Sequence, residues 1–145
     1  MKFLADVMVC NLARWLRILG FDTTSANNKM SDNELLLIAT KEQRILLTRD
    51  KKLGNRKNVY FLKSTTISEQ LTELKKAFGL KIEFPKNTRC AVCNGELEQT
   101  TREKLEKKVP EKTKSNAFWV CKACGKAYWK GSHWKRIIGT LQKLR

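Results

Sequence analysis

The chain is poor in acidic residues, in histidine and in long apolar runs. Of its 145 residues, 14 are Asp or Glu and 30 are Lys or Arg, so its formal net charge is +16. A domain of this charge repels itself unless it has a polyanionic partner, and nucleic acid is the default partner. No apolar run approaches the ~18 residues of a membrane-spanning helix. The first residues include a charge at Asp6 and no signal-peptide cleavage site, which predicts a cytoplasmic protein.

The five cysteines favour a metal site over disulfides, because their number is odd and no secretion signal precedes them. Cys90-x-x-Cys93 and Cys121-x-x-Cys124 are separated by 27 residues. Two such pairs are typical of a tetrahedral zinc site, with Zn–S distances of ~2.3 Å. Since protein thiolates fill all four positions, we predict structural zinc. The remaining Cys10 is expected to be a small buried residue on a helix.

The character of the sequence changes near Pro85. Residues 1–84 have a net charge of +6 and hold all four aspartates, whereas residues 85–145 have a net charge of +10 and hold four of the five cysteines. Hard oxygen ligands are thus separated from soft sulfur ligands. We predict a first domain over residues 1–84, followed by a zinc ribbon with a basic C-terminal helix over residues 85–145. Residues 100–115 are expected to form a long hairpin or a mobile loop.

Strands and helices alternate in the first domain. The apolar patterns and capping residues predict the order β-α-β-α-β-β-α. This order indicates an α/β domain with a mainly parallel sheet flanked by helices. The expected strands cover residues 3–5, 21–26, 44–48 and 58–63, and the expected helices cover residues 12–19, 32–40 and 67–78.

Three aspartates are predicted to meet at one edge of this sheet. Asp6 ends the first strand, Asp32 begins the helix after the second, and Asp50 follows the third, so all three lie at the carboxyl edge, where open α/β sheets bind ligands. Asp22 begins a strand and should lie at the opposite edge. Such carboxylates would repel each other without a cation, and Mg²⁺ or Mn²⁺ suits oxygen ligands. Each acid taken alone also fits a simpler role, since Asp32 or Glu34 can cap a helix.

Hydrolysis assisted by such a metal requires no histidine, which suits a chain whose only histidine is His133. The C-terminal part interleaves aromatic rings with cations, a pattern that suits unpaired bases and phosphates. About half of these rings are expected to form the core of the ribbon instead. The candidate RNA contacts there are Lys126, Trp129, Lys130, His133, Trp134, Lys135 and Arg136.

Three arginines of the first domain are candidates for positioning phosphate. Arg14 and Arg17 are expected to project from the helix face opposite its apolar stripe, and Arg49 lies beside Asp50. A guanidinium can bind a phosphate through two parallel hydrogen bonds. A solvated helix face or a structural ion pair explains the same arginines equally well.

Several ordered segments carry a resemblance to a known family. They are Phe3-Leu4-Ala5-Asp6, the run from Leu12 to Asp22, Leu46-Leu47-Thr48-Arg49-Asp50, the first knuckle with Asn94-Gly95-Glu96-Leu97, and the second knuckle through Gly131-Ser132-His133-Trp134. Together they resemble the Mut-seven C-terminal RNase family of PIN-like nucleases. The resemblance implies a PIN-like domain followed by a zinc ribbon and metal-dependent RNase activity. It also implies that Asp6 and Asp50, with Asp32 or Glu34 as the middle acid, are the acidic positions.

These observations predict a Mg²⁺- or Mn²⁺-dependent endoribonuclease acting on single-stranded or looped RNA. The alternative from another class is a non-catalytic zinc-ribbon adaptor that binds RNA or associates with the ribosome, in which the acids are structural. DNA stays open as the substrate, because positive charge alone does not distinguish the two nucleic acids.

Overall fold

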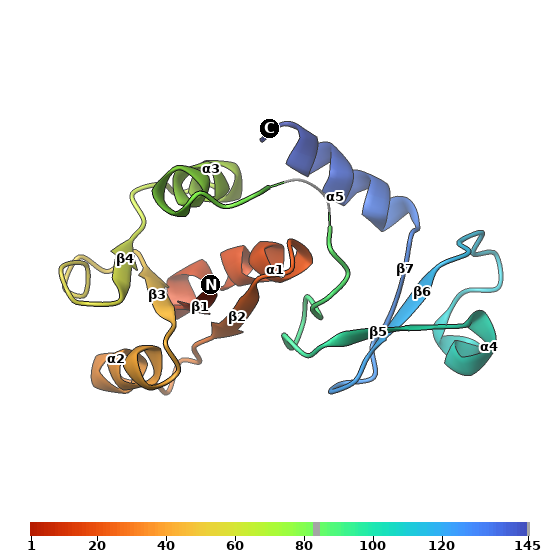
Figure 1. Cartoon of the computed structure of the whole chain (residues 1–145), viewed down its shortest axis with the longest axis horizontal. Helices are drawn as coiled ribbons and strands as arrows, with labels where there is room; N and C mark the ends of the chain where they lie inside the picture. Colours follow the sequence, from red (N-terminus) through yellow and green to blue (C-terminus); the bar gives the residue numbers. More distant parts are fainter. Residues whose placement is uncertain (83–84, 145) are drawn as a thin grey trace.

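The computed structural model describes residues 1–82 and 85–144, which form a four-stranded and a three-stranded sheet (Figure 1). The first sheet is entirely parallel, with the strand order β2-β1-β3-β4. The predicted α/β class, with helices flanking a parallel sheet, is confirmed. Its strands are β1 (Lys2–Ala5), β2 (Asp22–Ser25), β3 (Ile45–Thr48) and β4 (Val59–Phe61).

Three helices flank this sheet, namely α1 (Cys10–Ile18), α2 (Asp32–Lys41) and α3 (Ile67–Phe78). Side chains cap the start of two of them. The side chain of Ser31 accepts a hydrogen bond from the N–H of Glu34 at the start of α2, and the side chain of Thr66 accepts one from the N–H of Glu69 at the start of α3. Helix α3 ends at Gly79 in the left-handed region (φ 64°), which only glycine adopts without strain.

The helices divide between the two faces of the sheet, each with its own apolar cluster. Helices α1 and α3 cover one face, where Phe3, Leu12 and Leu71 are fully buried. Helix α2 covers the other face, where Leu35 packs with Leu46. This two-sided covering explains why β1 and β3 read as continuous apolar runs.

A short 3-10 helix, η1 (Val7–Val9), was not predicted and connects β1 to α1. It leaves Met8 64% exposed, so the apolar residues after Asp6 do not continue the buried strand. Cys10 begins α1 and is exposed, and the prediction that it is buried is wrong. The apolar stripe that packs on the sheet passes through Leu12 and Leu16, and Cys10 lies outside it.

The second sheet is antiparallel, with the order β5-β6-β7. Its strands are β5 (Leu97–Thr100), β6 (Phe118–Cys121) and β7 (Ala127–Trp129). Residues 100–115, for which we expected a long hairpin or a mobile loop, contain helix α4 (Arg102–Leu105) and the 3-10 helix η2 (Glu106–Lys108). Leu105, Val109 and Phe118 form a small core beneath it.

The last helix, α5 (Ser132–Gln142), returns to the first domain. Leu141 is fully buried and Leu144 is 8% exposed, and both belong to the apolar cluster of α1 and α3. Gly131 occupies the cap position of α5, and no side chain caps this helix. The division at residue 84 therefore separates two sheets but not two independent cores. None of the helices in the described residues is long and apolar enough to span a bilayer.

Candidate functional site

The first candidate site lies where the strand order reverses. The chain runs from β1 to β2 on one side and then crosses to β3 on the other side of β1. Open parallel sheets bind ligands in the crevice at the carboxyl ends of the strands on either side of such a switch point. Asp6 directly follows β1, and Asp50 comes two residues after β3.

A single hydroxyl connects these two aspartates. Thr48 is fully buried at the end of β3, and its Oγ1 donates a hydrogen bond of 2.8 Å to Oδ2 of Asp6. The same oxygen accepts a hydrogen bond of 3.0 Å from the backbone N–H of Asp50. The Asp6 carboxylate also accepts a bond of 2.7 Å from the N–H of Val7, and Asp50 Oδ1 accepts one of 2.9 Å from the N–H of Lys52. Both oxygens of Asp6 and one oxygen of Asp50 thus accept a hydrogen bond that fixes the carboxylate.

The structure also separates the two candidates for the middle acid. Glu34 Oε2 accepts a hydrogen bond of 2.7 Å from the N–H of Ser31, which closes a reciprocal capping box. Asp32 is the first residue of α2 and is exposed, and its carboxylate takes no part in the capping box. It does not join Asp6 and Asp50 in one tight group: among the described residues, only the four ribbon cysteines form a set of three or more potential ligands within 4.8 Å of one another.

None of Asp6, Asp32 and Asp50 forms an ion pair with another described residue. Arg49, between Thr48 and Asp50, is half-buried, and its Nε atom is buried without a hydrogen-bond partner. The edge therefore combines uncompensated carboxylates with a guanidinium that has an unused donor. Carboxylate and hydroxyl oxygens of this kind fit a hard divalent cation, and the guanidinium fits a phosphate.

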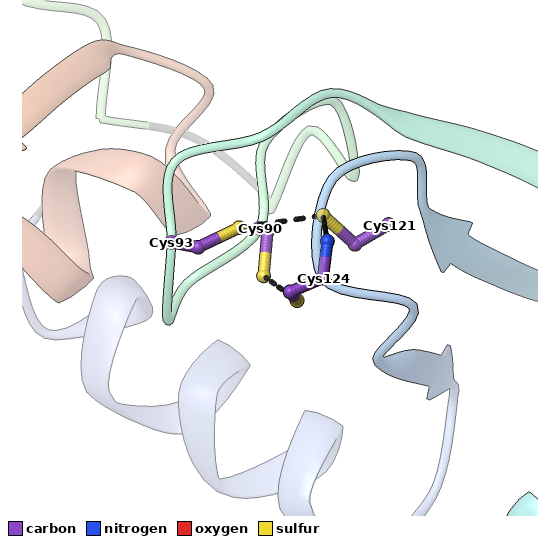
Figure 2. Close-up of side chains that lie close together, drawn as sticks. All are labelled: Cys90, Cys93, Cys121 and Cys124. Carbon is purple, nitrogen blue, oxygen red and sulfur yellow. Dashed lines mark hydrogen bonds between the residues drawn. The ribbon is translucent and has the colours of Figure 1, made fainter.

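The four ribbon cysteines form the second candidate site. Their sulfur atoms converge from two turns, with Cys90 Sγ 3.7 Å from Cys124 Sγ and Cys93 Sγ 3.4 Å from Cys121 Sγ (Figure 2). A tetrahedral site with Zn–S distances of ~2.3 Å has S···S edges of roughly 3.8 Å, so the cluster can bind zinc. Gly95 has no room for a side chain, because a Cβ atom there would lie 2.8 Å from Cys121 Sγ.

Tyr128 supports this cluster. Its hydroxyl lies 2.9 Å from Cys90 Sγ and accepts a hydrogen bond of 3.2 Å from the N–H of Ala91. Burial raises the pKa of Cys90, but the Tyr128 hydroxyl and the backbone N–H groups of the knuckle outweigh burial and lower this pKa to about 7. A lowered pKa favours the thiolate, which is the form of cysteine that binds a metal.

Arg17 does not project into solvent, and that prediction is wrong. It is 7% exposed, because the first knuckle packs against its side of α1. Its Nε donates to the carbonyl of Thr23 at 2.7 Å, and the two terminal nitrogens donate to the carbonyls of Ala91 and Val92 and to Ser25 Oγ. Because these bonds occupy most of its donors, Arg17 is a clamp between β2 and the knuckle and is not available to phosphate.

Asn94 completes this junction. Its Oδ1 accepts a hydrogen bond of 2.9 Å from the N–H of Thr23, which covers the open edge of β2. Its Nδ2 donates to Asp22, which also pairs with Arg44 at 2.7 Å and lies 3.7 Å from Arg89. Asp22 therefore lies at the amino edge as predicted and has a structural role.

The other predicted contacts to nucleic acid gather near the start of α5. Arg14 Nη2 lies 3.2 Å from Nε2 of His133, and this contact joins α1 to α5. Lys130 Nζ lies 5.4 Å from the ring centroid of Trp134, a cation–π distance. Trp129 is half-buried and packs partly on the core of the ribbon. Three cations, Lys126, Lys135 and Arg136, are exposed.

The chain thus joins an α/β sheet, with carboxylates that form no ion pair at its switch point, to a basic four-cysteine module. The family model of the Mut7-C RNAse domain matches residues 1–141, and the chain belongs to this family. Membership indicates a nuclease or RNA-related role, with RNA as the indicated substrate. No curated protein and no solved structure shows significant similarity to the chain.

The sequence suggested no role for Thr48 or Asn94, and it grouped Tyr128 with the rings that could stack on bases rather than with the cysteines. The signal for Thr48 was its place in Leu46-Leu47-Thr48, where a hydroxyl ends a buried strand two residues before an aspartate. Asn94 and Tyr128 gave no comparable signal, because their partners lie 71 and 38 residues away in sequence.

Proposed function

We propose that the chain is a Mg²⁺- or Mn²⁺-dependent endoribonuclease that hydrolyses phosphodiester bonds in single-stranded or looped RNA. The observation that carries this proposal is the hydrogen bonding of Asp6 and Asp50 to the same buried hydroxyl, Thr48, at the switch point of the sheet. The family match supports the nuclease class, and the net charge of +16 supports a polyanionic substrate.

In this proposal Asp6 and Asp50 hold the metal with their remaining oxygen lone pairs, and Asp32 contributes from the start of α2. The capping box occupies Glu34, which favours Asp32 as the third acid. A bound divalent cation would supply an activated water and would neutralise charge on the leaving oxygen. Cleavage would leave a 5′ phosphate and a 3′ hydroxyl.

The residues of the chain then have distinct tasks. Thr48 is a positioning residue, because it fixes Asp6 through its hydroxyl and the backbone of Asp50 through its lone pair. Arg49 would orient the phosphate with the terminal nitrogens of its guanidinium. The zinc-loaded ribbon, held by Cys90, Cys93, Cys121 and Cys124, would keep the basic C-terminal part in place against α1.

The test is cleavage of labelled single-stranded and hairpin RNAs by zinc-loaded protein, with added Mg²⁺ or Mn²⁺. Asp50→Asn should abolish cleavage and keep RNA affinity, and Thr48→Val should lower the rate about 10–100-fold. Asp32→Asn should lose activity and Glu34→Gln should keep it. The matched control is Asp22→Asn, at the opposite edge of the same sheet, which should cleave normally per folded molecule.

The adaptor stays as the second candidate, because Asp6 caps η1 and thus has a structural use without any metal. RNA binding with no cleavage of several RNAs in either metal would favour the adaptor and refute the hydrolase. Cleavage that survives in Asp50→Asn would also refute the proposed site. Parallel reactions with DNA of the same sequence decide the nucleic acid.

A further inference from the structure

Two adjoining cavities lie between the domains, away from the carboxylates. They have volumes of about 90 and 300 Å³ and share Arg14, Ala91, Tyr128, Trp129 and His133 in their walls. These residues come from α1, the first knuckle, β7 and the first turn of α5. The cavities therefore exist only where both domains and the last helix meet.

Four aromatic rings lie in the wall of the smaller cavity, beside aliphatic, polar and cationic side chains. Trp119, Tyr128, Trp129 and Trp134 all contribute to its wall, with the apolar side chains of Ile18 and Ile137. A cavity walled by flat rings suits a flat ring system, and an unpaired nucleobase stacks on such side chains whatever its identity.

Cationic side chains line both cavities. Arg14 is exposed and contacts His133, Lys126 lies in the wall of the larger cavity, and Arg89 in that of the smaller one. No described residue in either wall is an aspartate or a glutamate. Arg89 is already directed toward Asp22, whereas Arg14 has no carboxylate partner among the described residues. The uncompensated charge of Arg14 thus favours an anion at the mouth.

We infer that this interdomain pocket binds one unpaired nucleotide of the RNA, with its base against the tryptophan rings and its phosphate at Arg14 and His133. The inference rests on the proposed function for the identity of the polymer, but it requires no cleavage. It assigns the pocket the task of anchoring a single-stranded segment, and the switch-point edge of the sheet keeps the task of cutting.

Binding is measured by fluorescence anisotropy with zinc-loaded Asp50→Asn protein and no added Mg²⁺ or Mn²⁺. The probes are a labelled oligoadenylate and an oligomer of equal length and charge that lacks every base. We expect the baseless oligomer to bind at least about tenfold more weakly, because stacking on the rings is lost. Equal affinity for the two oligomers would overturn the pocket.

Variants locate the effect. Arg14→Gln, at an exposed position that leaves folding intact, should weaken oligoadenylate binding about tenfold. Its matched control is Lys135→Gln, which removes the same charge from a residue outside both cavities and should cost about two- to threefold through general electrostatics alone. Trp134→Leu should erase the preference for the oligomer with bases, and its thermal unfolding shows whether it folds.

Equal losses in the Arg14 and Lys135 variants would overturn the inference, as would tighter binding of a duplex with the same number of phosphates. The two proposals fail separately. If the wild type cleaves RNA but shows no preference for the oligomer with bases, the pocket proposal is wrong and the nuclease proposal stands. If binding shows a base preference that depends on Arg14 but no RNA is cleaved, the nuclease proposal is wrong and the pocket proposal stands.

Discussion

Replacement of Arg17 by methionine tests whether the four-cysteine module stabilises the parallel sheet. Methionine keeps the length of the buried side chain but removes its hydrogen bonds to the carbonyls of Thr23, Ala91 and Val92. Burial lowers the pKa of Arg17, and the nearby Cys90 and Cys93 act in the opposite direction. The guanidinium stays charged, since arginine is protonated throughout the accessible pH range.

The expected magnitude follows from these bonds. A hydrogen bond to a charged group contributes about 1.5–3 kcal/mol, and water can replace some of the lost bonds at the knuckle, so we expect a net loss of about 3 kcal/mol. For a chain of this size that corresponds to a decrease in Tm of roughly 6–12 °C. Arg14→Met is the matched control. It lies one turn away on α1, is exposed, and should change stability by about 0.5 kcal/mol or less.

Differential scanning calorimetry of the zinc-loaded variants gives Tm, and hydrogen exchange reports on the junction directly. The amide of Thr23 is bonded to Asn94 of the knuckle, so its protection should decrease in Arg17→Met and also on zinc removal. Equal Tm values for the Arg17 and Arg14 variants, with unchanged protection of Thr23, would refute the clamp.

Three further predictions concern the metal, acid and salt. Metal analysis of the folded protein should return about one zinc per chain, and chelation should lower Tm by at least roughly 10 °C. A protein that folds without zinc would show that residues 85–145 are not a zinc ribbon. Burial raises the pKa of Asp22, but hydrogen bonds from Arg44 and Asn94 outweigh burial and hold it below the ordinary 3.8. Its stabilising contribution is therefore present above that pH and lost as the pH falls through the folded-state pKa, so unfolding curves of wild type and Asp22→Asn should converge in acid. RNA affinity should decrease about 20-fold between about 50 and 200 mM salt if three phosphates are contacted, and a flat response would contradict the role of the charge.

The sequence predicted the parts of the fold that depend on local pattern. Helix caps at Ser31 and Thr66 and the apolar strands follow from short-range rules, so their order and the parallel sheet could be inferred. The knuckle spacing was equally informative, because four thiolates at that spacing have few other uses. The positions of Asp6 and Asp50 at the carboxyl ends of β1 and β3 could be expected from the topology alone.

What could not be predicted depends on contacts between the domains. Helical periodicity places Arg17 away from the apolar stripe of α1, and only the packing of the knuckle on that side makes it buried. The same holds for Tyr128, which the pattern groups with stacking rings and the structure places on Cys90 Sγ. Leu141 is a further example. Nothing in the sequence around it indicated that this side chain would pack into the apolar core of the first domain.

The return of α5 has a consequence for how the chain is made. Leu141 and Leu144 complete the core of the first domain, yet they are synthesised about 60 residues after Ile82, the last member of that cluster before the ribbon. At about 5–20 residues per second, the nascent sheet waits roughly 3–12 s with part of its apolar face uncovered. During that interval the exposed apolar face is open to aggregation, and the first domain acquires its final form only after the ribbon has been translated.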